Sequence, residues 1–401
     1  MKYDFTSVID RQGRDALAVD GLGKNPGGTP GAPREGFDAI PMWVADMNFP
    51  TAPTVQKAVI DRMRHPAFGY FEPREEYFDA IIRWQERRNG VSGLTRECIG
   101  YENGVLGGLI SALKAFAAPG DCVLVHSPTY IGFTGSIEGN GYKIVHSPLK
   151  LDENGIWRMD FEDMDRKLKE NHIHAAVLCS PHNPCGRVWE RWELEQAMEI
   201  YRDNDCMVIS DEIWSDLTLE GYHHIPTQSV SRDARERTVA LYAPSKTFNL
   251  AGLIGSYHII YSPLLRDRVR SVSGKTHYNG MNLCSMYALM GAYCREGEEW
   301  LEELRQVLTK NVDFAWNYIR EQFPGIQVSR PQGTYMLFLN CSGWCQANGK
   351  TLDELLKAGW DVGVAWQDGR PFHGACAIRM NLALPLQRVQ EAFHRLSQYV
   401  F

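Results

Sequence analysis

Five apolar segments between residues 98 and 246 each lead into a residue type that could take part in chemistry. They lead, in chain order, into Gly104, Tyr130, Asn183, Asp211 and Lys246. Each residue alone has a simpler explanation, such as a turn, a helix cap or a solvated lysine. If the five segments are strands of one open sheet, however, all five residues lie at its carboxyl edge, where such sheets bind ligands.

The surroundings of Lys246 favour a buried amine. It follows the apolar run VALYAP and precedes Phe248 and Leu250. Burial lowers the pKa of an amine and makes it a nucleophile or a base. One chemistry uses all five residue types, namely that of pyridoxal phosphate. The lysine carries the cofactor, a carboxylate keeps the pyridine nitrogen protonated, an amide contacts the ring hydroxyl, an aromatic ring stacks on it, and a helix start binds the phosphate.

The elements around these residues predict an α/β fold. Short apolar runs alternate with helical patterns from about residue 50 to 285, which indicates a mostly parallel sheet covered by helices on both faces. After residue 285 a long amphipathic helix over 287–323 leads into alternating strands and further helices, which predicts a smaller α+β domain. The Gly- and Pro-rich start is expected to be an extended arm that completes this domain. The expected division is 1–49, 50–285 and 286–401.

Composition narrows the class of protein. The chain has 401 residues, a net charge of -7, 44% hydrophobic and 23% charged residues, an ordinary globular balance. It has no basic stripe, so nucleic-acid binding is not expected, and no apolar run long enough for a membrane helix. The start lacks a secretory signal, which predicts a cytoplasmic protein.

Ten cysteines without CxxC pairing are expected to be reduced, mostly buried thiols, and no metal site is predicted. The adjacent His223 and His224 are expected in a solvated loop.

Several motifs resemble a known family. CSPHNPCGRVW, SDEIW, APSKTFNLAG and IRMNLALP are similar to fold-type I pyridoxal-phosphate enzymes of the aminotransferase class I/II superfamily, and more narrowly to the MalY/PatB group of cystathionine β-lyases. YDFTSVIDR, VADMNFPTAP, the FGY at 68–70 and PTYIGF extend the resemblance nearly from end to end. It implies a large cofactor-binding domain, a smaller domain and a homodimer.

The resemblance also implies a role for each site residue. Lys246 would hold the cofactor and move the proton, and Asp211 would pair with the pyridinium nitrogen. Arg379 would bind the substrate carboxylate by a bidentate pair, although from the residues alone a surface arginine is the simpler reading. The other implied contacts to the cofactor come from Gly104, Val105, Leu106, Tyr130, Asn183, Ser245 and, across the subunit interface, Tyr70.

Two positions depart from the patterns of related enzymes. The residue three after the aspartate is usually His in the MalY/PatB group and Tyr in many aminotransferases, and here it is Trp214. Its indole N–H can only donate, so it either contacts the cofactor ring oxygen or narrows the pocket. Ile254 occupies the position of an arginine found in aspartate-aminotransferase-like enzymes. The MalY/PatB group also lacks that arginine, which favours a lyase.

The expected activity is β-elimination from an S-substituted L-cysteine derivative such as L-cystathionine, giving homocysteine, pyruvate and ammonia. An aminotransferase acting on an L-amino acid shares every cofactor residue and is the first alternative. A regulatory protein that retains the cofactor but acts by binding a partner is the second.

Overall fold

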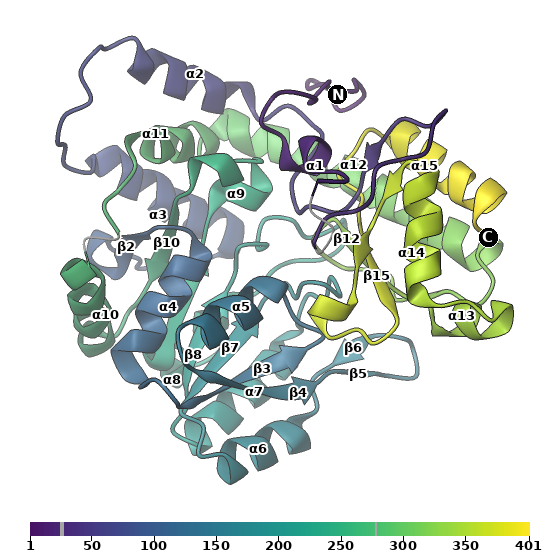
Figure 1. The fold of residues 1–401 in the computed structure, drawn as a ribbon. Coiled ribbons are helices and arrows are strands. Elements are labelled where there is room, and N and C mark those ends of the chain that lie inside the picture. Colours follow the sequence, from purple (N-terminus) through teal and green to yellow (C-terminus); the bar gives the residue numbers. More distant parts are fainter. Residues whose placement is uncertain (25–27, 277–278) are drawn as a thin grey trace.

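A seven-stranded sheet forms the centre of the larger part of the molecule (Figure 1). The computed structural model describes residues 1–24, 28–276 and 279–401. Every neighbouring pair in this sheet is parallel except those made by the antiparallel β10. In spatial order the strands are β2 (Ile99–Glu102), β10 (Ser256–Ile259), β9 (Thr238–Tyr242), β8 (Met207–Asp211), β7 (Ala175–Cys179), β3 (Cys122–Ser127) and β4 (Lys143–Pro148). The predicted mostly parallel sheet is confirmed.

Alternate residues of the central strands enter different hydrophobic cores, as period-two side-chain geometry requires. Val123 and Val125 pack in one core, whereas Leu124 belongs to the core on the other face. This explains why the strands read as continuous apolar runs. The first core contains residues of α4 (Val105–Phe116), α5 (Ile131–Gly139) and α10 (Pro263–Thr276). The second contains residues of α6 (Phe161–Glu170), α7 (Arg191–Asp203) and α8 (Arg232–Arg237).

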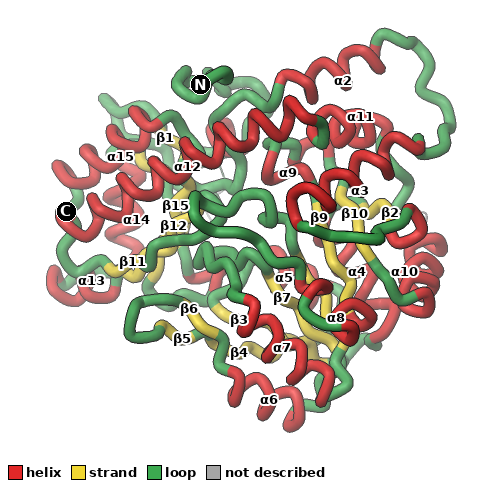
Figure 2. The backbone as a smooth tube through the Cα atoms, turned by 180° about the vertical axis from the view of Figure 1, so that it is seen from behind, coloured by secondary structure: helices red, strands yellow, loops and turns green. Residues whose placement is uncertain are grey.

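A second, antiparallel sheet lies toward the C-terminus (Figure 2). Its order is β11 (Gln327–Val328), β12 (Met336–Asn340), β15 (Ala377–Asn381) and β14 (Gln367–Asp368). Helices α13 (Ser342–Asn348), α14 (Leu352–Asp361) and α15 (Leu386–Tyr399) belong to the same region. The two sheets lie on either side of residue 285, and the division into domains stays a prediction.

The N-terminal arm joins this second region. After the short helix α1 (Leu17–Asp20), β1 (Ile40–Pro41) pairs in parallel with β13 (Val364–Ala365). Phe5 packs edge-on against Phe49 at 5.3 Å between ring centroids. The arm is followed by α2 (Pro53–Met63) and α3 (Glu75–Asn89), and α3 ends at Gly90 with φ of 65°, the left-handed residue typical of helix ends. The hairpin β5 (Lys150–Leu151) and β6 (Trp157–Arg158) and the short helix α9 (Pro244–Thr247) complete the fold.

The single long helix predicted over 287–323 is wrong in one respect, because the chain forms two helices there. Helix α11 (Leu283–Ala292) ends before Cys294, and α12 (Arg295–Gln322) begins after it. The Cys294 thiol caps α12 by accepting from the Gly297 N–H. A Cβ atom on Gly297 would lie 1.9 Å from the Ala292 carbonyl oxygen, so only glycine allows this tight junction.

Two further expectations concern cysteines and membrane spans. All ten cysteines lie in the described part of the chain and are free thiols, as predicted. Within the described ranges, no helix combines the length and the apolar character needed to span a bilayer.

Candidate active site

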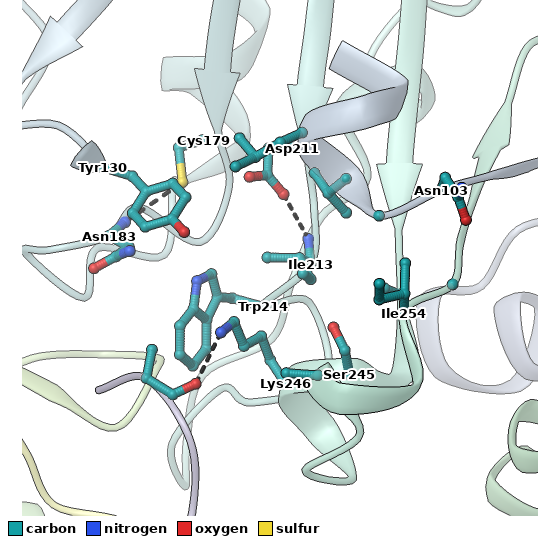
Figure 3. Close-up of a pocket in the computed structure, with 17 residues that line it drawn as sticks. Asn103, Tyr130, Cys179, Asn183, Asp211, Ile213, Trp214, Ser245, Lys246 and Ile254 are labelled. Atoms are coloured by element: carbon teal, nitrogen blue, oxygen red, sulfur yellow. Dashed lines mark hydrogen bonds between the residues drawn. The ribbon is translucent and has the colours of Figure 1, made fainter. Parts of the chain in front are cut away.

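A cavity of about 310 Å³ lies where β7, β8 and β9 end (Figure 3). Each strand delivers one functional side chain, because parallel strands end at the same edge of the sheet. The sequence-predicted residues that line the cavity are Gly104, Val105, Leu106, Tyr130, Asn183, Asp211, Trp214, Ser245 and Lys246. Arg379 lies beside it and contacts Asn183, whereas Tyr70 lies away from it.

Lys246 projects into this cavity from α9, the short helix that follows β9. Its Nζ donates to the Ala45 carbonyl oxygen at 2.8 Å. Burial, and after it the nearby Arg379 charge, lowers the pKa of the Lys246 amine from the ordinary 10.5 to about 8, whereas the charges of Asp46 and Asp211 oppose the shift. An appreciable fraction of this amine is therefore neutral near neutral pH, as a nucleophile or base requires.

Asp211 is the last residue of β8 and is buried at the floor of the cavity. Burial raises the pKa of its carboxyl to about 7, although the Ile213 N–H, donated at 3.1 Å, and the Lys246 charge favour the ionised form. Because the buried Asp211 carboxyl receives few hydrogen bonds, a cation placed next to it would stabilise its ionised form.

Glu212, the next residue along the chain, points to the other side of the strand. Its carboxylate accepts from His224 Nε2 at 2.6 Å, from the Tyr242 hydroxyl at 2.6 Å and from the Ser210 hydroxyl at 2.8 Å. The prediction that His224 is solvated is wrong, because its side chain is only 2% exposed. A buried carboxylate requires such a partner, and nothing local in the sequence indicated it.

Arg379 is buried on β15, so the alternative that it is a surface arginine is wrong. Its Nη1 donates to Asn183 Oδ1 at 3.3 Å and its Nη2 to the Trp43 carbonyl oxygen at 3.0 Å and to the Gln367 amide oxygen. Burial lowers the pKa of this guanidinium to about 10. Among the described residues, no acceptor lies within hydrogen-bond distance of the buried Nε. The guanidinium therefore retains donor capacity for an anion.

Tyr130 and Trp214 are the two aromatic rings of the cavity (Figure 3). The Tyr130 ring lies beside Cys179 and Asn183. Trp214 is only 2% exposed and packs edge-on against Tyr335 at 4.8 Å, and its ring centroid lies 5.9 Å from Lys246 Nζ. The indole therefore fills space next to the reactive amine.

Helix α4 begins at the rim of the cavity. Gly104 precedes it with φ of 77°, a conformation that favours glycine, and its N–H already donates to the Glu102 carbonyl oxygen. The first N–H groups of the helix, from Val105 and Leu106, have no acceptor within a helix and suit an anion. The Ser245 side chain also borders the cavity.

The segment 43–47 of the N-terminal arm borders the cavity through Ala45, which the sequence did not indicate. Its carbonyl groups accept from Lys246 at Ala45 and from Arg379 at Trp43. The Asn381 side chain donates to two more carbonyls of the segment. Three other lining residues were not predicted, because their types alone do not indicate a site. They are Cys179, Asn103 and Ala251.

Tyr70 is fully exposed on the connection between α2 and α3, which projects from the body of the molecule (Figure 1). Phe68 on the same connection is also exposed. Tyr70 therefore does not belong to the cavity of its own protomer.

Comparison with known proteins identifies the family. The model of the family described as aminotransferase class I and II matches residues 40–396. The chain belongs to this family. Cystathionine beta-lyase PatB of Bacillus subtilis is 34% identical over 396 residues, which cover 98% of each chain. This full-length similarity places the chain in the MalY/PatB group of the family.

Solved structures of the family superpose closely. Cystalysin from Treponema denticola, whose crystal contains pyridoxal 5'-phosphate, gives a TM-score of 0.90 at 29% identity and covers 99% of this chain and 98% of its own. The pyridoxal-phosphate-bound C–S lyase from Staphylococcus hominis gives 0.87 at 28% identity and covers 98% of each chain. The predicted fold-type I architecture is confirmed.

Proposed function

We propose that this aminotransferase-family chain is a pyridoxal-phosphate-dependent C–S lyase. It catalyses β-elimination from S-substituted L-cysteine derivatives such as L-cystathionine and releases a thiol, pyruvate and ammonia. The observation that carries the proposal is the buried amine of Lys246, with its lowered pKa, in one cavity with Asp211 and beside Arg379. The cystathionine β-lyase and C–S lyase names of full-length relatives support the choice of reaction.

The residues present fit the cofactor. Burial disfavours the ionised form of the Asp211 carboxyl. A protonated ring nitrogen next to it would be the cation that stabilises this carboxylate. The start of α4 and the Ser245 hydroxyl suit the phosphate, with the N–H groups following Gly104 as donors. Tyr130 supplies a ring face and Asn183 an amide. The Trp214 indole narrows the remaining space. The cofactor, when bound, supplies an electron sink for the negative charge that forms at the substrate Cα.

The chain itself binds the substrate and moves the proton. Arg379 binds the substrate carboxylate through its free donor capacity, since a guanidinium matches a carboxylate in a planar, two-point pair. Lys246 would hold the cofactor through its amine and, with that amine free, would remove the Cα proton. Its lowered pKa suits this role, because a base is most effective when its pKa lies near the working pH.

An aminotransferase would use the same cofactor residues, so the assay must separate the two reactions. We expect purified protein with pyridoxal phosphate and cystathionine, but no keto acid, to release pyruvate and free thiol. Turnover only after addition of a keto acid would instead identify an aminotransferase. Lys246→Ala should lose both pyruvate release and covalent attachment of the cofactor. Lys150→Ala, which removes an exposed lysine, is the matched control.

The active unit proposed is a homodimer in which Tyr70 reaches the phosphate site of the neighbouring subunit. Its full exposure together with the exposed Phe68 supports this, because a projecting aromatic segment is typical of an interface. The ten free thiols of the described chain support a cytoplasmic location, where cysteines stay reduced.

A further inference from the structure

The loop that presents Asn183 to the cavity is a tight hairpin closed by Arg187. The His182 N–H donates to the Arg187 carbonyl oxygen at 2.7 Å, and the Gly186 N–H donates to the His182 carbonyl oxygen at 2.7 Å. Asn183 lies between these bonds. The backbone position of Asn183 is therefore tied to that of residues 186 and 187.

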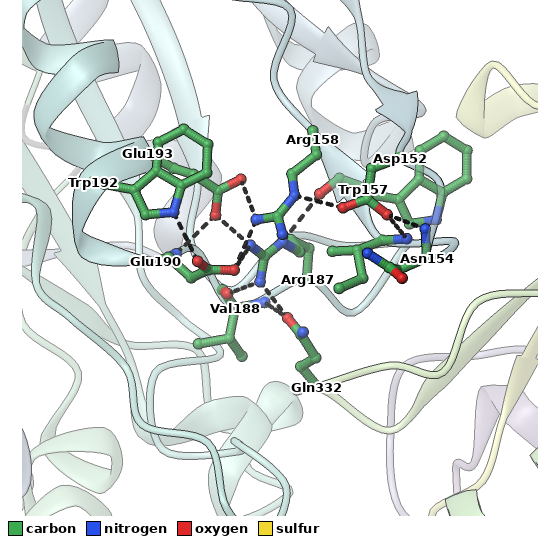
Figure 4. A network of polar contacts seen from close by, with 11 residues as sticks. Asp152, Asn154, Trp157, Arg158, Arg187, Val188, Glu190, Trp192, Glu193 and Gln332 are labelled. Carbon is green, nitrogen blue, oxygen red and sulfur yellow. Dashed lines mark hydrogen bonds and ion pairs between the residues drawn. The ribbon is translucent and has the colours of Figure 1, made fainter.

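Arg187 is held in place by a buried polar network (Figure 4). Its guanidinium pairs with the fully buried Glu193 carboxylate, donates to Glu190 Oε1 at 2.9 Å, and donates through Nε to the Trp157 carbonyl oxygen at 3.0 Å. Because each buried donor has a fixed acceptor, the guanidinium has a defined position. Arg158 neutralises the same carboxylates from the more exposed side, with Nη1 at 2.7 Å from Glu190.

Gln332 connects this network to the segment that leads into β12. Its side-chain oxygen accepts from Arg187 Nη1 and from the Val188 N–H at 3.2 Å. The N–H groups of Gln332 and Gly333 both donate to the Gly186 carbonyl oxygen, at 2.7 and 3.0 Å. A Cβ atom on Gly186 would lie 2.4 Å from Pro331 Cβ, so the two segments pack here without space for a side chain at residue 186.

The same two segments meet again at the cavity. After Gln332 the chain passes Tyr335, which packs on Trp214, and enters β12, where Phe338 pairs with Arg379 of β15. Arg379 then contacts Asn183 at 3.3 Å. The contact of Arg187 with Gln332 and the contact of Asn183 with Arg379 therefore both join the Asn183 hairpin to the region of the second sheet.

We propose that Arg187 and Gln332 are positioning residues that place Asn183 and Arg379 for the carboxylate of the substrate. This inference rests on the proposed function, because it takes Arg379 as the carboxylate-binding residue. Removal of the Gln332 acceptor leaves the buried Val188 N–H without its side-chain acceptor and takes one of two acceptors from Arg187 Nη1, which keeps the Val188 carbonyl oxygen. The hairpin is then expected to move to satisfy the lost hydrogen bonds. A displacement of about 1 Å at a binding site is enough to weaken a two-point pair strongly.

The test uses three variants of the cofactor-loaded protein. Gln332→Met removes the acceptor at similar volume, and Gln332→Glu restores an acceptor for Arg187. Arg158→Gln removes a charge from the same network without a contact to Gln332. Binding of L-alanine, which has no sulfur to eliminate, is measured by the change in visible absorbance. Pyruvate release from cystathionine gives kcat, and the affinity of the cofactor-free protein for pyridoxal phosphate is measured separately.

We expect Gln332→Met to weaken L-alanine binding by about tenfold, which corresponds to one lost buried hydrogen bond, with kcat and cofactor affinity nearly unchanged. Gln332→Glu and Arg158→Gln should bind L-alanine within about threefold of the parent chain. Unchanged L-alanine binding in Gln332→Met would overturn the inference. So would equal losses of L-alanine binding, kcat and cofactor affinity in Gln332→Met and Arg158→Gln, which would mean general support of the fold. If the parent chain releases no pyruvate, the proposed function fails, and the L-alanine titration still decides the inference.

Discussion

The lowered pKa of Lys246 predicts how the reactivity of this amine depends on pH. Only a neutral amine attacks an aldehyde, and the neutral fraction rises as the pH rises through the pKa. With a pKa of about 8, roughly one tenth of Lys246 is neutral at pH 7. For a lysine with the ordinary pKa of 10.5, the neutral fraction at that pH is about 300-fold smaller. Burial is the main cause and the Arg379 charge the second, so Arg379→Leu should move the midpoint upward.

The assay labels the cofactor-free chain briefly with pyridoxal and cyanoborohydride between pH 6 and about 10 and counts labelled peptides by mass spectrometry. Pyridoxal lacks the phosphate, so phosphate titration does not contribute. Labelling of Lys246 should reach half of its maximum near pH 8 and level off toward the end of the range. Exposed Lys150 serves as the internal control, because its hydrogen bond to Asp160 raises its pKa, and its labelling should still be rising at the end of the range. Parallel profiles for the two lysines would refute the argument from burial.

Three further predictions concern the other site residues. Asp211→Asn should lower kcat by about 100- to 1,000-fold in the pyruvate assay while cofactor binding persists, because an amide does not stabilise a protonated ring nitrogen; a kcat near that of the parent chain would contradict this role. Arg379→Lys should raise KM by about 30-fold, since an ammonium cannot form the two-point pair, and an unchanged KM would argue against carboxylate binding. Tyr70→Ala and Lys246→Ala chains, each nearly inactive alone, should regain activity when refolded together, because one mixed site then has both residues; no recovery would exclude a contribution across subunits.

Much of the central sheet and of the cavity could be predicted from the sequence. The strands were recognisable because both of their faces are buried, which produces short apolar runs bounded by Gly and Pro. The residues that follow these strands met as expected, because parallel strands bring their ends to one edge. The positions of Lys246, Asp211 and Asn183 at the cavity follow from that rule.

What could not be predicted depends on contacts between distant segments. The junction between α11 and α12 results from the close approach of Gly297 to the Ala292 carbonyl group, and a helical pattern does not reveal it. His224 is buried because a carboxylate twelve residues earlier needs a partner. Arg379 was not recognisable as buried from its neighbours alone, since two of its three acceptors come from the N-terminal arm and from Asn183.

The hydrogen bonds of residues 43–47 have a consequence for biosynthesis. Two of their donors, Arg379 and Asn381, are translated more than 330 residues after them. The carbonyl groups of Trp43, Val44 and Asp46 therefore stay hydrated until both donors have been synthesised. A nascent polypeptide that has completed only its parallel sheet therefore lacks the Arg379 and Asn381 contacts that hold this stretch beside the cavity.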